Sequence, residues 1–240
     1  MNESVTFNGV EISDFYQVAS VTRPLAGRAN TFTEIGGMNG ARLTGSVMQQ
    51  ATIGVRLVMC DMDSTGRREA ARRLSSMIHT DEPSRLYIGS DNGRYYMAIL
   101  DGEVPFTEHV RSGLVELNFV TETPLLYGRE RSVSVPSQGE AGFLVGGTYA
   151  TRPVVEGTVT GDGSSGLWGV RLDDGDVMRI RAGSGVTVSM DCDSRTATVS
   201  GELRLPTLGS DWLELAPGRH VLRNDVGSGA CTVRWREMWI

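Results

Sequence analysis

Along much of this chain, apolar residues alternate with polar or small ones, and this pattern constrains the fold more than any other feature. Ile53, Val55 and Leu57 alternate in this way in one stretch, and residues 186–192 alternate without a break. Because successive side chains of a β-strand point to opposite faces, such stretches predict strands with one buried face. The chain also contains 30 glycines, which favour turns between short strands. Both observations predict a mainly β fold.

One stretch, residues 65–79, has helical rather than strand periodicity. Its apolar positions repeat at the spacing of one helix face, and they are Ala70, Leu74, Met77 and Ile78. Asp63 or Ser64 can cap the first turn, and Pro83 prevents the helix from continuing into the next segment. We interpret the arginines of this stretch as a solvated helix face rather than as a binding patch.

The first half of the chain predicts an α+β domain, which we place at residues 1–132. After the helix, strands are expected at residues 85–89, 95–100 and 114–120. A sheet with one helix packed on it accounts for this order of elements. Near the amino terminus, Asn8 and Gly9 interrupt a short alternating stretch at 5–12, and an Asn-Gly pair predicts a tight hairpin turn.

The second half, residues 133–240, shows no helical pattern. A segment rich in glycine and serine at 129–147 is interpreted as a linker, with the alternative that it contains the first strand of the next domain. Beyond it, about eight short strands with regular turns predict a β-sandwich. These strands are expected at 154–160, 167–172, 177–182, 186–192, 196–200, 212–215, 220–224 and 231–236.

Composition disfavours several classes of function. The chain has 240 residues, of which 29 are acidic and 23 basic, so its formal net charge is −6. No block of basic residues occurs, which disfavours direct nucleic-acid contact. No apolar run is long enough to span a membrane, and the first residues lack the pattern of a secretory signal. We therefore expect assembly in a cytoplasm, without membrane or nucleic-acid contact.

The three cysteines, Cys60, Cys192 and Cys231, are far apart and form no C-x-x-C pair. An odd and sparse set argues against both a disulfide framework and a zinc site. Cys192 and Cys231 are in phase with apolar neighbours on expected strands. We therefore predict that these two are buried free thiols.

The sequence contains no convincing catalytic constellation, so we expect no enzyme, no metal and no cofactor. Residues 161–166 match G-x-G-x-x-G, but a strand pattern follows where a dinucleotide site needs a helix. The acidic residues at 172–176 lack the spacing of a calcium loop and are interpreted as a polar turn. Three further carboxylate pairs lie at the ends of expected elements, where acidic residues cap and turn the chain: Asp61 with Asp63, Asp81 with Glu82, and Asp191 with Asp193. The histidines, His79, His109 and His220, form no metal-binding pair.

Residues 23–50 do not fit the pattern of short strands and tight turns. The region contains two closely spaced glycine-rich pairs, 36–37 and 39–40, and is too long and too polar for a normal connection. It is either a mobile surface loop or an arm, such as a β-hairpin, that reaches a neighbouring subunit and adds strands to its sheet.

Three of the four tryptophans, Trp212, Trp235 and Trp239, lie near the carboxyl end. On a sandwich they are candidates for a sugar-stacking face, although Trp235 is in phase with Cys231 and is expected in the core. The chain ends in Trp239 and Ile240. An apolar end predicts docking on its own domain or on a partner.

The order of elements between residues 67 and 128 resembles one protein family. A helix is followed by a turn at 81–87, a tyrosine-rich strand at 95–102, a return strand at 114–120 and Pro-Leu-Leu-Tyr-Gly at 124–128. This order is similar to that of the distal tail proteins of bacteriophages with long non-contractile tails. In the second half, residues 190–192 before a hairpin, and residues 215–220, resemble the galectin-like sandwich of that family. The resemblance covers nearly the whole chain, without an inserted carbohydrate-binding module.

The resemblance implies a structural protein of the virion tail tip, assembled in the cytoplasm of a bacterial host. It implies a hexameric ring built by the amino-terminal domains, between the tail tube protein and the tail-associated hub protein. A receptor-binding protein is a further candidate partner. The alternative, from another class, is a carbohydrate-binding protein that recognises a host surface through its sandwich.

The resemblance also favours the arm over the mobile loop. Its candidate contact residues are Arg23, Arg28, Phe32, Ile35, Met38, Arg42 and Met48. Trp239 and Ile240 are candidates for docking a partner.

Overall fold

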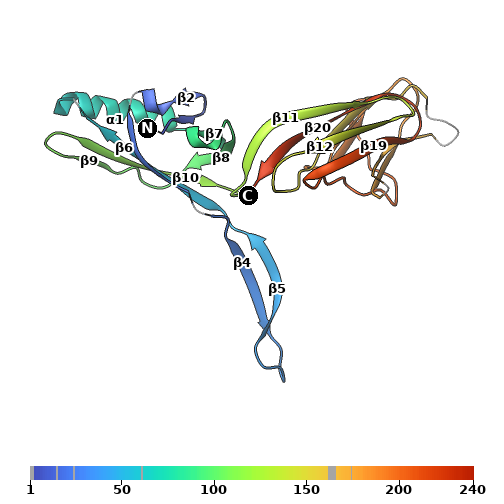
Figure 1. The fold of residues 1–240 in the computed structure, drawn as a ribbon, viewed down its shortest axis with the longest axis horizontal. Helices are drawn as coiled ribbons and strands as arrows, with labels where there is room; N and C mark the ends of the chain where they lie inside the picture. Colours follow the sequence, from blue (N-terminus) through green and yellow to red (C-terminus); the bar gives the residue numbers. More distant parts are fainter. Residues whose placement is uncertain (1–2, 15, 24, 61, 162–165, 174) are drawn as a thin grey trace. The chain divides into compact units, whose positions relative to one another are not determined.

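The computed structural model describes residues 3–14, 16–23, 25–60, 62–161, 166–173 and 175–240 (Figure 1). The chain divides into two compact units, one of residues 1–127 with Ile240, and the other of residues 128–239. Strands dominate both units, which confirms the mainly β fold class. No helix in the described part of the chain is long and apolar enough to cross a membrane.

Unit 1 is built on an antiparallel sheet whose central strand is β6 (Ala51–Met59), with one helix, α1 (Ser64–Ile78), as predicted. The neighbouring strands in order are β3 (Gln17–Thr22), β6, β10 (Gly113–Thr121) and β8 (Tyr95–Leu100). Beyond β8 lie β7 (Ser84–Ile88), β1 (Val5–Phe7) and β2 (Val10–Glu11), while β9 (Phe106–Glu108) pairs with β10.

The core of unit 1 follows from the alternation in the sequence. Every second residue of β6, from Ala51 to Met59, is buried, and these side chains share a core with Leu74 and Ile78 of α1. The helix begins after Asp63, whose side chain accepts a 2.7 Å hydrogen bond from the Gly66 amide. Of the two predicted caps, Asp63 is therefore the one used. The predicted hairpin at the amino terminus also forms, because Asn8 and its glycine neighbour both adopt positive φ.

One arginine of α1 is not solvated. The Arg67 side chain is 5% exposed, and its guanidinium donates hydrogen bonds to the carbonyls of Met62 and His109 and to the Glu108 carboxylate. Arg68 also pairs with Glu108, at 3.3 Å. The interpretation of the helix arginines as a solvated face is therefore wrong for Arg67, because β9 carries an acidic residue to this side of the helix.

Unit 2 is a β-sandwich, as the sequence predicts. One sheet contains β18 (Glu202–Leu203), β17 (Thr196–Val199), β16 (Thr187–Asp191), β13 (Val154–Thr158) and β20 (Cys231–Trp239). The other contains β12 (Glu140–Val145), β19 (Gly218–Val226), β14 (Leu167–Leu172) and β15 (Val177–Arg181). Both contribute to one core, in which Trp168 of β14 and Val155 of β13 are fully buried.

Two expectations for this half are wrong. The segment 129–147 is not a linker, because β11 (Leu126–Val135) and β12 occupy most of it and bury Val135 and Val145. The alternative, that it contains the first strand of the next domain, is confirmed. Ser132, Ser134 and Gly142 occupy exposed positions of these strands, and the other glycines and Ser137 lie outside them. The segment 212–215 is not a strand, although Leu213 and Leu215 are buried there. It is held by a backbone bridge in which the amides of Thr151 and Leu215 each donate to the other's carbonyl.

On the outer side of unit 2, the Asp225 carboxylate lies between two arginines. It accepts hydrogen bonds from Arg171, at 2.7 and 2.9 Å, and from Arg179. Burial alone would raise the pKa of Asp225, but the hydrogen bonds from Arg179 and Arg171 outweigh burial and lower that pKa. The ion pairs therefore stabilise unit 2 while Asp225 is ionised, and this contribution is lost as the pH falls through the lowered pKa.

We predict that Asp225→Asn lowers the free energy of unfolding of unit 2 at neutral pH by about 1–2 kcal/mol, since both guanidinium groups are partly exposed and screened. All four tryptophans lie in unit 2, so urea unfolding followed by tryptophan fluorescence reports this unit alone. The difference between variant and wild type should shrink below about pH 4. An equal difference at pH 7 and pH 3 would contradict this assignment.

The cysteines give a second prediction. Cys60 is exposed, whereas Cys192 and Cys231 are buried, and burial raises the pKa of both buried thiols to about 12. At about pH 8 a thiol-specific chromogenic reagent should therefore modify one thiol per folded chain and all three after unfolding. Cys60→Ser should abolish the fast reaction. Rapid modification of a second thiol in the folded variant would show that the sandwich core opens easily.

Candidate assembly interface

The region 23–50 contains a β-hairpin, which we call the arm. Its strands, β4 (Arg28–Glu34) and β5 (Ala41–Met48), pair with each other and form a separate two-stranded sheet (Figure 1). At the tip, the Met38 amide donates to the Ile35 carbonyl at 3.1 Å, and Gly37 and Gly40 adopt positive φ. A bulge between Thr31 and Phe32 shifts the register by one residue.

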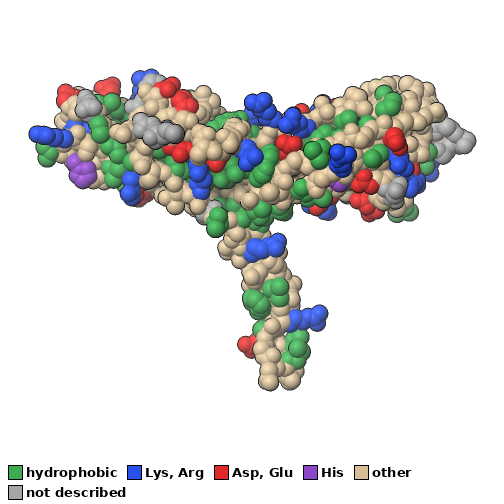
Figure 2. All heavy atoms as spheres, in the orientation of Figure 1, with side chains coloured by type: hydrophobic (Ala, Val, Ile, Leu, Met, Phe, Trp, Pro, Cys, Tyr) green, Lys and Arg blue, Asp and Glu red, His purple; other side chains and the backbone are tan. Residues whose placement is uncertain are grey.

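The arm exposes apolar side chains on both of its faces. Phe32 lies opposite Leu43 on one face, and these side chains are 61% and 52% exposed. Val47 lies opposite Ala29 and is 64% exposed. Because Ala29 and Phe32 are an odd number of residues apart on β4, the pair with Val47 occupies the other face. Figure 2 shows hydrophobic side chains at the surface of the arm. Such surfaces mark contact sites for other molecules.

The residues selected from the sequence do not all lie on the arm strands. Arg28 and Met48 face each other at the root of the arm, and Ile35 and Met38 belong to its tip. Arg42 lies opposite Thr33, on the face away from Phe32. Arg23 precedes β4 and is bound within unit 1, where it contacts Glu3, Ser90 and Asp91.

Three exposed large hydrophobic residues of this region are absent from that selection, namely Leu25, Leu43 and Val47. In the sequence, Leu43, Gly45 and Val47 have period-two spacing, although the bulge places Leu43 and Val47 on opposite faces of the arm. That pattern was the available signal, although the glycine gives the stretch the composition of a loop.

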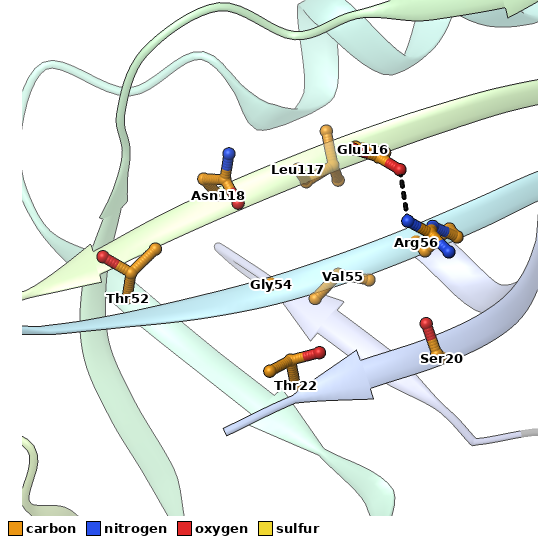
Figure 3. A pocket seen from close by; sticks show the side chains of 9 residues that line it. All are labelled: Ser20, Thr22, Thr52, Gly54, Val55, Arg56, Glu116, Leu117 and Asn118. Atoms are coloured by element: carbon orange, nitrogen blue, oxygen red, sulfur yellow. Dashed lines mark hydrogen bonds and ion pairs between the residues drawn. The ribbon is translucent and has the colours of Figure 1, made fainter. Parts of the chain in front are cut away.

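A second surface is the face of the β3–β6–β10 sheet that points away from the core (Figure 3). It contains an open depression of about 350 Å³, lined by Ser20, Thr22, Thr52, Gly54, Val55, Arg56, Glu116, Leu117 and Asn118. Arg56 and Glu116 form an exposed ion pair of 2.6 Å across β6 and β10. Gly54 lacks a side chain between Thr22 and Asn118, which hollows the surface at this point. The depression offers hydrogen-bond donors and acceptors to a polar partner.

Two of the residues considered for chemistry make structural contacts within unit 2. Asp191 accepts hydrogen bonds from the amides of Asp193 and Ser194, and so caps the turn after β16. His220 lies between the Asp173 carboxylate, at 2.9 Å, and the Ala216 carbonyl, at 2.7 Å. Within the described residues, no group of three or more His, Cys, Asp or Glu side chains could hold a metal ion.

Some residues considered from the sequence lie outside the described residues. Asp61, Asp174 and residues 162–165 of the glycine-rich match are among them. The segment that follows this match is β14, a strand as predicted.

The tryptophans of unit 2 mostly face inward. Trp168 and Trp235 are buried, and Trp212 packs against the core. Trp239 is half-buried, and its ring lies so close to Gly128 that a Cβ there would come within 2.5 Å of it. Ile240 is 58% exposed. No observation on these side chains favours the carbohydrate-binding alternative.

The exposure of the arm predicts that its apolar residues contribute little to the stability of a single chain. Phe32→Ser combined with Leu43→Ser should change the free energy of unfolding of unit 1 by less than about 1 kcal/mol. Because α1 is in unit 1, ellipticity at 222 nm during urea unfolding measures this effect.

The matched control is Phe119→Ser, since Phe119 is fully buried and its ring lies 4.8 Å from that of Phe7. That substitution should cost about 3 kcal/mol or more. Comparable losses in the arm variant and the control would show that the arm packs on unit 1.

Comparisons with known proteins agree across the chain. A family model described as a phage tail protein RIFT-related domain matches residues 9–121, and one described as a siphovirus-type tail component, C-terminal domain, matches residues 146–239. The distal tail protein of Bacillus phage SPP1 is 26% identical over 237 residues, covering 89% of this chain and 87% of that protein.

Solved structures share the fold. The crystal structure of SPP1 Dit, described as a paradigm of the hub adsorption apparatus in phages that infect Gram-positive bacteria, has a TM-score of 0.82 at 18% identity, with 100% of both chains covered. A chain of the phage P2 baseplate in its activated conformation with calcium has a TM-score of 0.53 at 8% identity, covering 98% of this chain and 97% of that one.

Proposed function

Because this chain belongs to the distal tail protein family of siphophages, we propose that copies of it close a hexameric ring in the tail tip. The chain is a structural phage tail-tip protein, and the ring is the finer assignment that we add. In this proposal the ring joins the tail tube protein to the tail-associated hub protein, and assembly occurs in the cytoplasm of the bacterial host.

The observation that carries this proposal is the exposed arm. A two-stranded sheet with apolar residues on both faces is marginal in water by itself. A neighbouring copy can cover Phe32, Leu43 and Val47 and satisfy the free edges of β4 and β5. The arm and the surface that receives it are different patches, so each contact is heterologous, and such contacts form a ring when the rotation between neighbouring copies closes.

Two further surfaces are assigned to neighbouring proteins of the tail tip. The polar depression beside Gly54 suits a polar partner such as the tube or hub protein. The chain end at Trp239 and Ile240 offers an exposed apolar residue beside a half-buried ring, which suits a docking contact, with a receptor-binding protein as a further candidate.

The structure indicates how the arm can be removed cleanly. The Gln49 amide donates to the Gly27 carbonyl at 3.1 Å. Replacing residues 28–48 with Asn-Gly therefore leaves a two-residue hairpin turn at the point where the legs already meet. We predict that the shortened chain folds but remains monomeric. The measurement is solution mass by light scattering over a range of concentrations.

The full chain is the reference, with an expected mass near six times the 26.0 kDa of one subunit. Circular dichroism of both proteins serves as the control for folding. A shortened chain that still forms the same oligomer would exclude the arm as the ring contact. A full chain that stays at 26.0 kDa throughout would contradict a ring formed by this protein alone.

A further inference from the structure

The arm is a continuation of a hairpin that begins in the sheet of unit 1. In the β3–β6 ladder, Thr22 lies opposite Gly54, and in the β4–β5 ladder, Arg28 lies opposite Met48. The two residue numbers add to 76 in both pairs, so residue i faces residue 76 − i on either side of the junction, from Ser20 to Thr22 and from Arg28 to Thr31. The bond between Gly27 and Gln49 obeys the same register.

The strand pairing is therefore interrupted at the junction without a change of register. Five residues lie between Thr22 and Arg28, and five also lie between Met48 and Gly54. An insertion in one leg would have changed the register. Equal legs without ladder pairs among their described residues are instead the arrangement of a hinge, where the hairpin can change direction while both ladders stay intact. Leu25, in this stretch, is 94% exposed and gives the junction no packing.

Arg23, the first residue of the junction, is held by groups from two other segments. One of its terminal nitrogens, Nη2, lies 2.6 Å from the Ser90 hydroxyl and 3.3 Å from the Glu3 carboxylate. Its Nε lies 3.6 Å from the Asp91 carboxylate. Glu3 also accepts a 2.8 Å hydrogen bond from the Ser90 amide, which joins the amino terminus to the turn between β7 and β8. The guanidinium thus closes a small network around two carboxylates.

These contacts restrict the orientation of Arg23 and so hold the chain in one direction where the hinge begins, which we call the lock. A guanidinium has several donors in a fixed plane, so contacts in three directions restrict its orientation more than a single ion pair would. Nε of Arg23 and Oδ2 of Asp91 are both buried, without a hydrogen-bond partner among the described residues, so their ion pair is only lightly screened. Within the described part of the junction, Arg23 supplies the side-chain hydrogen bonds to the body of unit 1.

We propose that Arg23 is a positioning residue that locks the hinge between the two ladders and so sets the direction in which the arm leaves unit 1. This inference rests on the proposed function for its consequence, because a ring closes only if each arm points at the next copy. The lock itself is a property of one chain. It is therefore testable without the ring.

The direction of the arm can be measured as a distance within one chain. A nitroxide on the exposed Cys60 and a second on Met38→Cys report the separation between the body of unit 1 and the arm tip. Cys192 and Cys231 are buried and remain unlabelled. Doubly labelled chains are diluted into unlabelled chains, so that pulsed electron paramagnetic resonance records intramolecular distances in any oligomeric state.

We expect a narrow distance distribution for the parent chain and a distribution at least about twofold broader for Arg23→Ala. Arg111→Ala, which removes an exposed arginine from the same unit, is the control and should leave the width unchanged. Equal widths in Arg23→Ala and the parent chain would overturn the inference. A triple variant, Glu3→Gln, Arg23→Ala and Asp91→Asn, leaves no unpaired charge in the network. It should broaden the distribution as much as the single variant, and a narrow distribution there would assign the effect to charge repulsion instead.

Light scattering on the same proteins separates this inference from the ring. A broad distance distribution together with a smaller oligomer for Arg23→Ala supports both the lock and its role in assembly. Broad distances with an unchanged oligomer would retain the lock and contradict the arm as the ring contact. Narrow distances with a smaller oligomer would overturn the lock and assign Arg23 a direct contact with the next copy.

Discussion

The antiparallel ladder between β6 and β10 is the constraint on which unit 1 depends. It pairs nine residues of each strand without interruption, from Ala51 opposite Thr121 to Met59 opposite Gly113. A shift of one residue would turn the buried side chains of β6 towards water, so the core specifies this register strongly. The same register places the polar residues around Gly54 on the outer face. Because β3 pairs with β6, the register of the β6–β10 ladder also determines where the arm begins.

Several acidic and histidine side chains of this protein make structural contacts, whereas the arm exposes apolar side chains. Acidic residues such as Asp191 and Asp63 cap turns and a helix, and His220 is held between a carboxylate and a carbonyl. The arm, by contrast, leaves Phe32 and Val47 exposed, at a cost that a single chain does not recover. This division supports the proposal that neighbouring copies cover the arm.

Local patterns predicted much of the fold. Features that depend on contacts between distant segments were not predicted. The helix with its cap at Asp63, the Asn-Gly turn, the strand at 167–172 and the buried cysteines depend on neighbouring residues, so they could be recognised in order along the chain. A linker was preferred to a strand at residues 129–147 because Ser132, Ser134 and Gly142 occupy exposed positions of β11 and β12. The contacts of Arg23 were missed because Glu3 and Asp91 are distant in sequence.

The sequence by itself determined that this chain is mainly β, where its helix lies, and which faces of its strands are apolar, because side-chain periodicity is a local property of the backbone. It also carried the order of elements by which the family was recognised. Only the tertiary structure decided that region 23–50 is a hairpin in register with β3 and β6, that Arg67 is buried against Glu108, and that Asp225 lies between two arginines. The partner of a charged or exposed side chain depends on which distant segments the fold brings together. No local pattern along the chain shows which segments will meet.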